Sequence, residues 1–181
     1  MKVIRNSKTG HVYTLSRTSA DTNGASLEME ASYPPQSKEP PAHYHPHQSE
    51  HFRVISGALT VRMKGQVRIL HAGDTLDVPP NTIHSMWNHT ANIATTEWIT
   101  APALNTEQFF ETFAALAESG RTNDEGVPSL LQLSLILPQF HNEFRLASPP
   151  FWIMRLAFTL LAPLARLAGY KPNPISPSAR T

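Results

Sequence analysis

The chain has no cysteine among its 181 residues. Disulfide bonds and thiolate ligands are therefore excluded, so any metal site must use nitrogen and oxygen donors. Strong charge is absent too: a net charge of +1 gives the protein as a whole no electrostatic affinity for nucleic acid. Because the first residues lack an apolar run of signal-peptide length, we expect a cytoplasmic location.

Short strands separated by turns are predicted from about residue 11 to residue 100. Apolar and polar residues alternate over 27–33, the period of a half-buried strand. The segments 59–63 and 67–69 flank a turn at Lys64-Gly65-Gln66, which indicates a hairpin. Many short strands at this spacing favour a sandwich or a small barrel.

Helices are predicted after Pro102. Asn105 resembles a capping residue, with Gln108 three places on, and apolar residues then recur at helical spacing until Gly120. Two further apolar segments follow, 130–144 and 151–168. We therefore divide the chain into a β-domain, residues 1–101, and a helical extension, residues 102–181, whose Pro-rich end is expected to be disordered.

Two polar clusters between residues 41 and 88 carry the chemistry. The first runs from His43 to Glu50 and is followed by Gly57; the second consists of Gly73, Pro79, Asn81, His84 and Asn88. His43 and His45 lie two residues apart, so on a strand both imidazoles point to the same side. Imidazole and carboxylate are ordinary ligands of divalent first-row metals, and a third histidine would complete a site of three histidines and one carboxylate.

These clusters resemble the two signature motifs of the cupin superfamily, in particular its single-domain members with quercetinase- or germin-like barrels. His43, His45, Glu50 and Gly57 match every element of the first motif. Gly73, Pro79, His84 and Asn88 match the second, and Asn81 stands where the family usually has glycine. Asparagine tolerates a left-handed backbone, so the turn can survive. The resemblance covers about residues 33–100.

The resemblance implies a mainly β fold: a double-stranded β-helix, or jelly-roll barrel, here followed by C-terminal α-helices. It also implies a divalent transition metal bound by His43, His45, Glu50 and His84. Iron, manganese, nickel, copper, cobalt and zinc all accept this ligand set. Two positions of an octahedral ion would stay open for water, substrate or dioxygen. The alternative is a barrel that has lost its metal, although this chain retains all four ligands.

Neighbouring residues give weaker predictions. His47 could replace His43 in a shifted alignment of the motif, but His43 restores the family spacing. His51 follows Glu50 and should therefore face the outside of the barrel. If Glu50 and His84 point inward, then Phe52, Val54 and Met86 do so as well. These three residues are candidates for an apolar substrate pocket, or else are simply barrel core.

The run 151–168 is apolar except for one narrow stripe that contains Arg155, Thr159 and Arg166. It is too short and too charged to span a membrane, and Pro163 would kink it. Residues 127–181 carry five lysines and arginines against one glutamate. The run therefore either packs on the barrel, the other helices or a second subunit, which makes a homodimer expected, or makes peripheral contact with a membrane.

Three functions remain open at this point. The first is a metal-dependent enzyme acting on a small organic molecule, led by a dioxygenase, with Glu50 as the residue that takes a substrate proton; isomerases, decarboxylases and lyases use similar sites. The second is a non-catalytic module that binds a small molecule. The third is a membrane-associated scaffold whose helices engage a partner. No helix-turn-helix signature accompanies the barrel, so a nucleic-acid partner is not expected.

Overall fold

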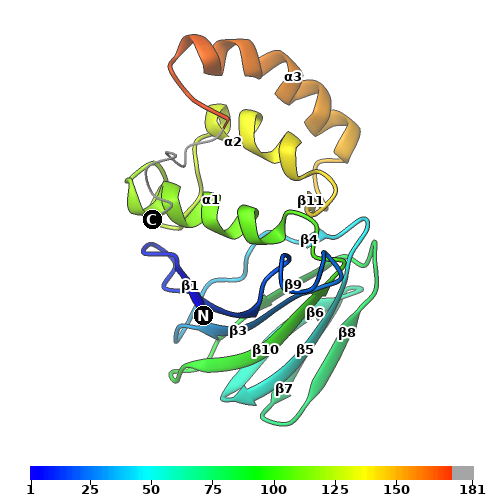
Figure 1. Cartoon of the computed structure of the whole chain (residues 1–181). Coiled ribbons are helices and arrows are strands. Elements are labelled where there is room, and N and C mark those ends of the chain that lie inside the picture. Colours follow the sequence, from blue (N-terminus) through cyan, green and yellow to red (C-terminus); the bar gives the residue numbers. More distant parts are fainter. Residues whose placement is uncertain (173–181) are drawn as a thin grey trace.

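The strands of the protein form two antiparallel sheets. A computed structural model describes residues 1–172 and places strands along most of the first hundred (Figure 1). The strands are β1 (Lys2–Arg5), β2 (Val12–Arg17), β3 (Leu27–Tyr33), β4 (His43–Tyr44), β5 (Ser49–Ser56), β6 (Ala58–Met63), β7 (Gln66–His71), β8 (Thr75–Val78), β9 (His84–Trp87), β10 (Ala94–Ala101) and β11 (Arg145–Leu146). One sheet has the order β1-β2-β3-β10-β5-β8 and the other β11-β4-β9-β6-β7.

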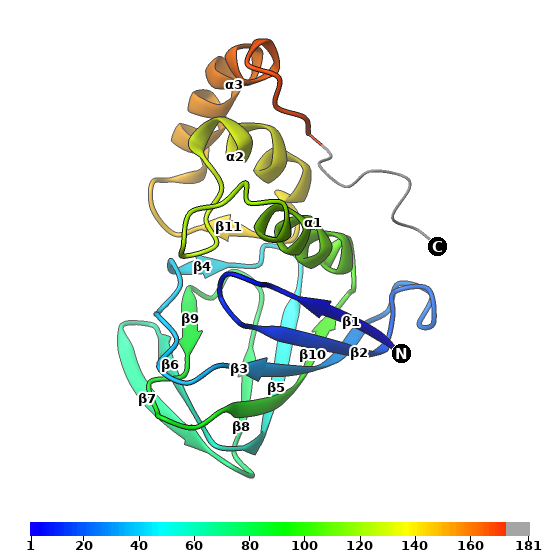
Figure 2. The ribbon, with the colours of Figure 1, turned by 90° about the vertical axis from the view of Figure 1, so that its left-hand side faces the viewer.

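The two sheets face each other (Figure 2). Side chains from both sheets form an apolar core between them. Alternation explains the burial: in β3 every second residue, from Leu27 to Tyr33, is buried, while the residues between them are partly or fully exposed. Ala31 and Tyr33 belong to the core between the sheets, and Leu27 and Met29 to a second cluster that Phe110 of the helical extension contacts. Phe52 and Val54 follow the same rule in β5. The predicted mainly β fold with helices at its C-terminal end is therefore confirmed.

The predicted hairpin is also present, and its turn has a local cause. Lys64 and Gly65 both have positive φ, 52° and 79°, between β6 and β7. This is the backbone of a two-residue turn whose twist matches the flanking strands. Gln66 pairs with Met63 and therefore belongs to β7 rather than to the turn.

Two positions of the sequence motifs depend on left-handed backbone. Asn81 has φ of 61°, so asparagine supports the turn in which the family usually has glycine, as predicted. Its backbone N–H donates to the carbonyl of His45, 2.9 Å away, which ties the second cluster to the first. Gly57 has φ of 75°, and a Cβ there would lie 2.6 Å from the carbonyl oxygen of Ile93.

The first helix begins next to Asn105, where the sequence predicts a helix start. It contains α1 (Thr106–Glu118), α2 (Leu130–Ile136), a 3-10 turn (Leu137–Phe140) and α3 (Phe151–Leu167). The predicted side-chain cap of α1 is wrong: Asn105 makes no capping bond and instead donates through Nδ2 to Glu143 Oε1, 2.9 Å away. The Asn105 side chain thus binds a residue that is distant in sequence instead of the backbone of its own helix.

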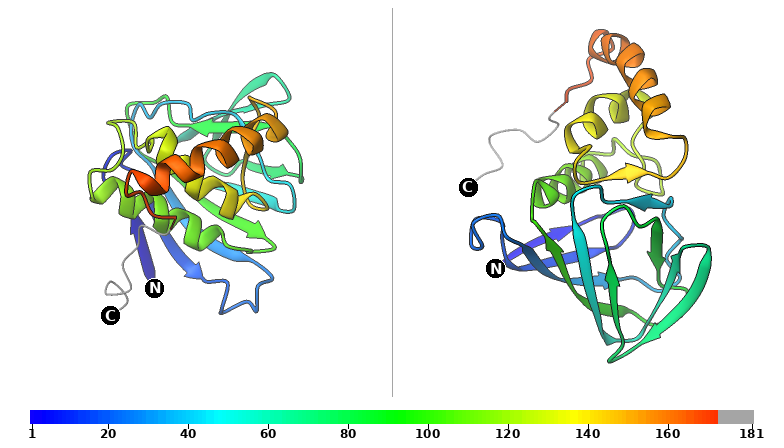
Figure 3. Two further views of the ribbon diagram at one scale, coloured as in Figure 1. Left: turned by 90° about the horizontal axis from the view of Figure 1, so that it is seen from above. Right: turned by 90° about the vertical axis from the view of Figure 1, so that its right-hand side faces the viewer.

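The helices stack in layers over one end of the barrel (Figures 1 and 3). α1 lies against the barrel, where Phe110 stacks on Tyr13 with ring centroids 4.4 Å apart. α2 covers α1, and α3 is the outermost layer. No helix within residues 1–172 is long and apolar enough to cross a membrane. Most of the Pro-rich end that we expected to be disordered, residues 173–181, lies outside the described residues.

The two glycines give a matched stability prediction. In Gly65→Ala the new Cβ has no atom within 4 Å. The substitution should therefore lower the free energy of unfolding by about 1 kcal/mol, which is the strain of alanine in a left-handed backbone. Gly57→Ala, at nearly the same φ, should cost about 3 kcal/mol because its Cβ also collides with backbone atoms of Ile93 and Ala94. Urea unfolding of the two variants measures both values, and equal losses would show that the close approach at Gly57 is not rigid.

Candidate metal centre

The sheet register brings the two sequence clusters together. β4 pairs with β9 so that His43 lies directly opposite His84. Glu50 comes from β5 in the facing sheet, where it pairs with Val78 and Thr100. His45 follows β4 at the point where the Asn81 turn holds the chain. All four predicted ligands therefore meet at the end of the barrel that α1 covers.

The three histidines form one cluster, and Glu50 lies beside two of them. One nitrogen from each of His43, His45 and His84 lies within 4.8 Å of the other two. Glu50 Oε2 is 3.2 Å from His45 Nε2 and 3.0 Å from His84 Nε2. This set of donors, three nitrogens and a carboxylate, suits a divalent transition metal.

Backbone carbonyls orient all three imidazoles. The Nδ1 atom of His43 lies 3.0 Å from the carbonyl oxygen of Pro41, and that of His84 lies 3.0 Å from the carbonyl of Thr82. His45 Nδ1 lies 2.5 Å from the carbonyl of Glu143. A carbonyl can only accept, so each Nδ1 carries a proton and each Nε2 is directed to the shared centre.

Burial and mutual contact shift the pKa values of these groups. Burial alone would raise the pKa of Glu50, but the adjacent His45 and His84 reverse this, and its pKa is lowered. Burial opposes protonation of His84, but the hydrogen bond and charge of Glu50 outweigh it and raise the pKa of His84. Burial, then the neighbouring His84 and His45, lower the pKa of His43 to about 3.

The residues present fit a metal ion. His45 Nε2 is buried without a hydrogen-bond donor in the described residues and faces the carboxylate of Glu50, which is another acceptor. Glu50 Oε1 is likewise buried without a partner. Facing acceptors in a buried site require a cation between them. The centre therefore has the chemistry of a metal site.

The weaker predictions have separate outcomes. His47 is exposed and outside the centre. His51 points away from it, as predicted, with Nδ1 2.7 Å from Asp77 Oδ1. Phe52 and Met86 line the cavity described below. Val54 is buried in the barrel core and does not line this cavity.

Sequence reasoning missed the contribution of the helical extension. β11 pairs with β4, with Leu146 opposite His43. Phe144 stacks on the ring of His43, with centroids 4.8 Å apart, and the Glu143 carbonyl holds His45. One signal was available, because Glu143 is the single acidic residue of 127–181. Glu143 is buried, and acidic residues are rarely buried unless they have partners.

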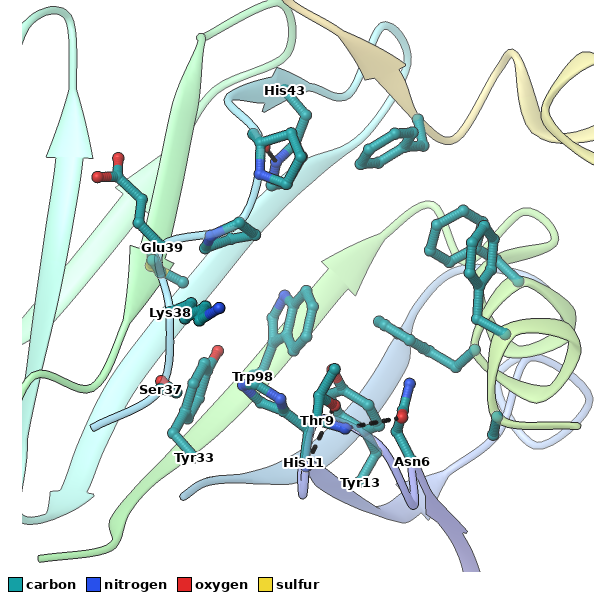
Figure 4. A pocket seen from close by; sticks show the side chains of 18 of the residues that line it. Asn6, Thr9, His11, Tyr13, Tyr33, Ser37, Lys38, Glu39, His43 and Trp98 are labelled. Carbon is teal, nitrogen blue, oxygen red and sulfur yellow. Dashed lines mark hydrogen bonds between the residues drawn. The ribbon is translucent and has the colours of Figure 1, made fainter. Parts of the chain in front are cut away.

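A cavity of about 1070 Å³ extends from the four ligands between the barrel and α1. Figure 4 shows His43 at one end and Trp98, Tyr33, Tyr13 and His11 along it. Phenylalanines of α1 and the extension line it from the other side; these are Phe109, Phe110, Phe113 and Phe144. Aromatic side chains thus form much of two facing sides of the cavity, whose lining also includes charged residues such as Lys8, Glu39 and Glu125.

Some residues that line this cavity carry a buried polar atom without a hydrogen-bond partner in the described part of the chain. Besides the ligand atoms, the lining residues supply buried atoms without a hydrogen-bond partner in residues 1–172: Gln48 Oε1, Trp98 Nε1, Thr100 Oγ1 and Glu143 Oε2. An apolar pocket with a small number of convergent polar groups is typical of a site for a small organic molecule.

Comparison with known proteins agrees with this architecture. Residues 29–100 match the family model described as a cupin domain. The chain is 28% identical over 147 residues to a probable oxidoreductase, virH, of Hypocrea virens, covering 74% of this chain and 65% of that protein. It is 33% identical over 127 residues to a probable oxidoreductase, yanE, of Aspergillus niger, covering 64% of this chain and 47% of that one. The match thus spans less than two thirds of either relative.

Among solved structures, KdgF from Halomonas sp. superposes with a TM-score of 0.50 at 15% identity, covering 59% of this chain and 93% of that chain. At this identity the likeness concerns the fold alone. Both signature motifs lie within or beside the matched residues, and the two sheets have the expected jelly-roll arrangement. Residues 29–100 of the barrel therefore form a cupin domain, as the two sequence motifs predicted.

Proposed function

We propose that this protein is a metal-dependent oxidoreductase, of the dioxygenase type, that acts on a small aromatic molecule. One observation carries the proposal: a cluster of three histidines, with Glu50 within 3.2 Å of two of them, opens into a cavity with aromatic walls. The oxidoreductase names of the two relatives support the reaction class.

His43, His45, Glu50 and His84 would hold the ion, whose identity the ligand set leaves open among the first-row metals. A bound metal would supply Lewis acidity and, if it is redox-active, a route for electrons between substrate and dioxygen. The protein itself contributes orientation: the three carbonyl partners fix the imidazoles, and Phe144 shields the His43 face from water.

The lining of the cavity favours an aromatic substrate over a phosphorylated one. No arginine of residues 1–172 lines it. Lys8 and Lys38, its two lysines, are paired with Asp124 and Glu125, at 3.3 Å and 2.5 Å. Aromatic walls gain from offset or edge contacts with another ring. A flat, mostly apolar molecule therefore satisfies this space better than an anion does.

Two carboxylates are placed to act on such a substrate. Glu50 has a lowered pKa and is ionised at neutral pH, so it can accept a substrate proton beside the metal. Glu143 keeps Oε2 free while Asn105 donates to Oε1 through both its backbone N–H and its side chain. It can therefore accept a hydrogen bond from a substrate hydroxyl.

Metal analysis coupled to oxygen uptake tests this function. Untagged protein purified without chelators should contain about one metal ion per chain and consume dioxygen with at least one member of a panel of phenols, thiols and keto acids. His45→Ala should lose about nine tenths or more of the metal and the uptake, because its orphaned nitrogen is a ligand. His47→Ala, two residues away but exposed, should lose neither.

Absence of stoichiometric metal from folded protein would refute the metal centre. Metal without oxygen uptake under any loading would refute the oxygenase. If the melting temperature then rose with one small molecule that is not consumed, the barrel would be a binding module rather than an enzyme.

Metal affinity should depend on pH in a defined direction. In the metal-free protein His84 has a raised pKa, so it still holds a proton somewhat above pH 6.5, the ordinary value for histidine. A metal must displace this proton. Apparent affinity for cobalt should therefore fall by up to about tenfold per pH unit as pH drops through the raised pKa. His51→Ala should show the same profile, whereas affinity that is constant from pH 6 to 8 would contradict the assignment.

Glu143→Gln separates substrate binding from metal binding. The backbone carbonyl that holds His45 remains, so metal content should not change. Loss of a charged acceptor should lower kcat/KM about tenfold or more for a hydroxylated substrate of the panel. The methyl ether of that substrate, which has no hydroxyl to donate, should be affected much less; equal losses for the two compounds would refute a hydrogen bond to Glu143.

A further inference from the structure

The outer surface of α3 is a continuous apolar face in contact with solvent. We call it the open face; it consists of Trp152, Ile153, Leu156, Leu160, Leu164 and Leu167. These residues recur every three or four positions, so they share one side of the helix. Trp152, Leu156, Leu160, Leu164 and Leu167 are 57–86% exposed. Single exposed leucines are common, but a stripe of this kind marks an interaction surface.

Within residues 1–172 no part of the fold covers the open face. α3 packs on α2 through its opposite side, where Phe158 and Ala165 are buried. The views of the molecule agree that α3 forms the outermost layer, at the end farthest from the barrel (Figures 1 and 3). The whole length of the open face is therefore accessible to a flat partner.

The surroundings of the open face are basic. Residues 144–172 contain Arg145, Arg155, Arg166 and Lys171 and no aspartate or glutamate. Arg155, Thr159 and Arg166 are exposed and follow one flank of the open face. The polar stripe predicted from sequence is thus a border between the buried and the open sides of α3. Cationic residues beside an apolar face are typical of helices that lie in the interface of an anionic membrane.

A second cavity supports an anionic partner. It measures about 490 Å³ and lies between the 3-10 turn, β11 and α3. Its lining includes Arg145, Arg155 and His141 together with apolar side chains such as Phe151 and Phe158. The Arg145 guanidinium stacks on Phe151 and donates to the His141 carbonyl, so it adds a fixed positive charge to this hollow. Arg155 is exposed at the edge of the open face and can contact a phosphate group, while the apolar lining is suited to hydrocarbon.

A second copy of the chain fits this surface less well. α3 has 17 residues, about 26 Å of helix and about 10 Å of width. A contact of that footprint falls well below the ~800 Å² per partner of a stable interface. A two-fold axis through the open face would also bring Arg155 and Arg166 toward their copies, and like charges destabilise such a contact.

We propose that α3 docks the protein on an anionic lipid bilayer, with the helix lying in the plane of the interface. The open face enters the acyl region, and Arg155 and Arg166 extend to the phosphate groups. A spanning arrangement is excluded because α3 is too short and contains Pro163. The proposal does not depend on the metal centre.

Vesicle flotation of the full chain tests this docking. The protein should float with vesicles of phosphatidylserine and phosphatidylcholine, much less with phosphatidylcholine alone, and less at high salt. The variant Leu156→Gln/Leu160→Gln should bind at least about tenfold more weakly because it removes buried apolar area. Arg155→Gln/Arg166→Gln should lose the preference for anionic lipid.

The matched control is Val67→Gln/Ile69→Gln, which changes two exposed apolar residues of β7, a strand of the barrel. It should bind vesicles like the unmodified protein. Thermal melts and metal content confirm that each variant is folded. Failure of the folded, unmodified protein to float, or equal flotation of the open-face variant, overturns the proposal. A dimer in light scattering that Leu156→Gln/Leu160→Gln dissolves would assign the face to a second copy instead.

Discussion

The site depends on one electrostatic constraint: hydrogen-bond acceptors face one another where water does not reach. The Nδ1 protons of His43, His45 and His84 are directed to backbone carbonyls, so the Nε2 lone pairs of His45 and His84 meet the Glu50 carboxylate. Such an arrangement is stable only with a cation in it. In the metal-free protein a proton on His84 provides part of that charge, which is why its pKa is raised while that of Glu50 is lowered. A bound metal would therefore compete with this proton for the same place.

Because of this constraint, the helical extension is part of the site and not only an addition to the barrel. The carbonyl that orients His45 belongs to Glu143, and the ring that covers His43 belongs to Phe144. Both residues precede β11, whose pairing with β4 fixes their position. The Glu143 side chain in turn binds Asn105 at the start of α1, and Gln48 of the barrel donates to Thr106 Oγ1, 2.8 Å away. Residues of the barrel and residues of the helical extension therefore both hold the site together.

The parts predictable from sequence are those that local spacing determines. His43 and His45 share a side because strands have a period of two, and Asn81 could be placed in a left-handed turn because few other residues tolerate one. Glu143 and Phe144 could not be placed, because their role depends on a strand of two residues that pairs with β4 about a hundred residues earlier. The predicted Asn105 cap was wrong for the same reason: its side chain binds the carboxylate of Glu143, which is distant in sequence, instead of the local backbone. The domain division at 101/102 and the homodimer stay predictions.

The aromatic cavity and the open face of α3 are connected by the expected solubility of the substrate. A molecule that suits walls of Trp98, Phe109 and Phe110 is poorly soluble in water and partitions into bilayers. A protein held at the interface by α3 would meet such a molecule at a higher local concentration than in solution. The coupling has a structural basis, because only residues 147–150 separate β11, which closes the site, from α3. A shift of α3 on docking would therefore be transmitted through β11 to Phe144 and the ring of His43, so vesicles that bind the open face should also alter access to the metal centre.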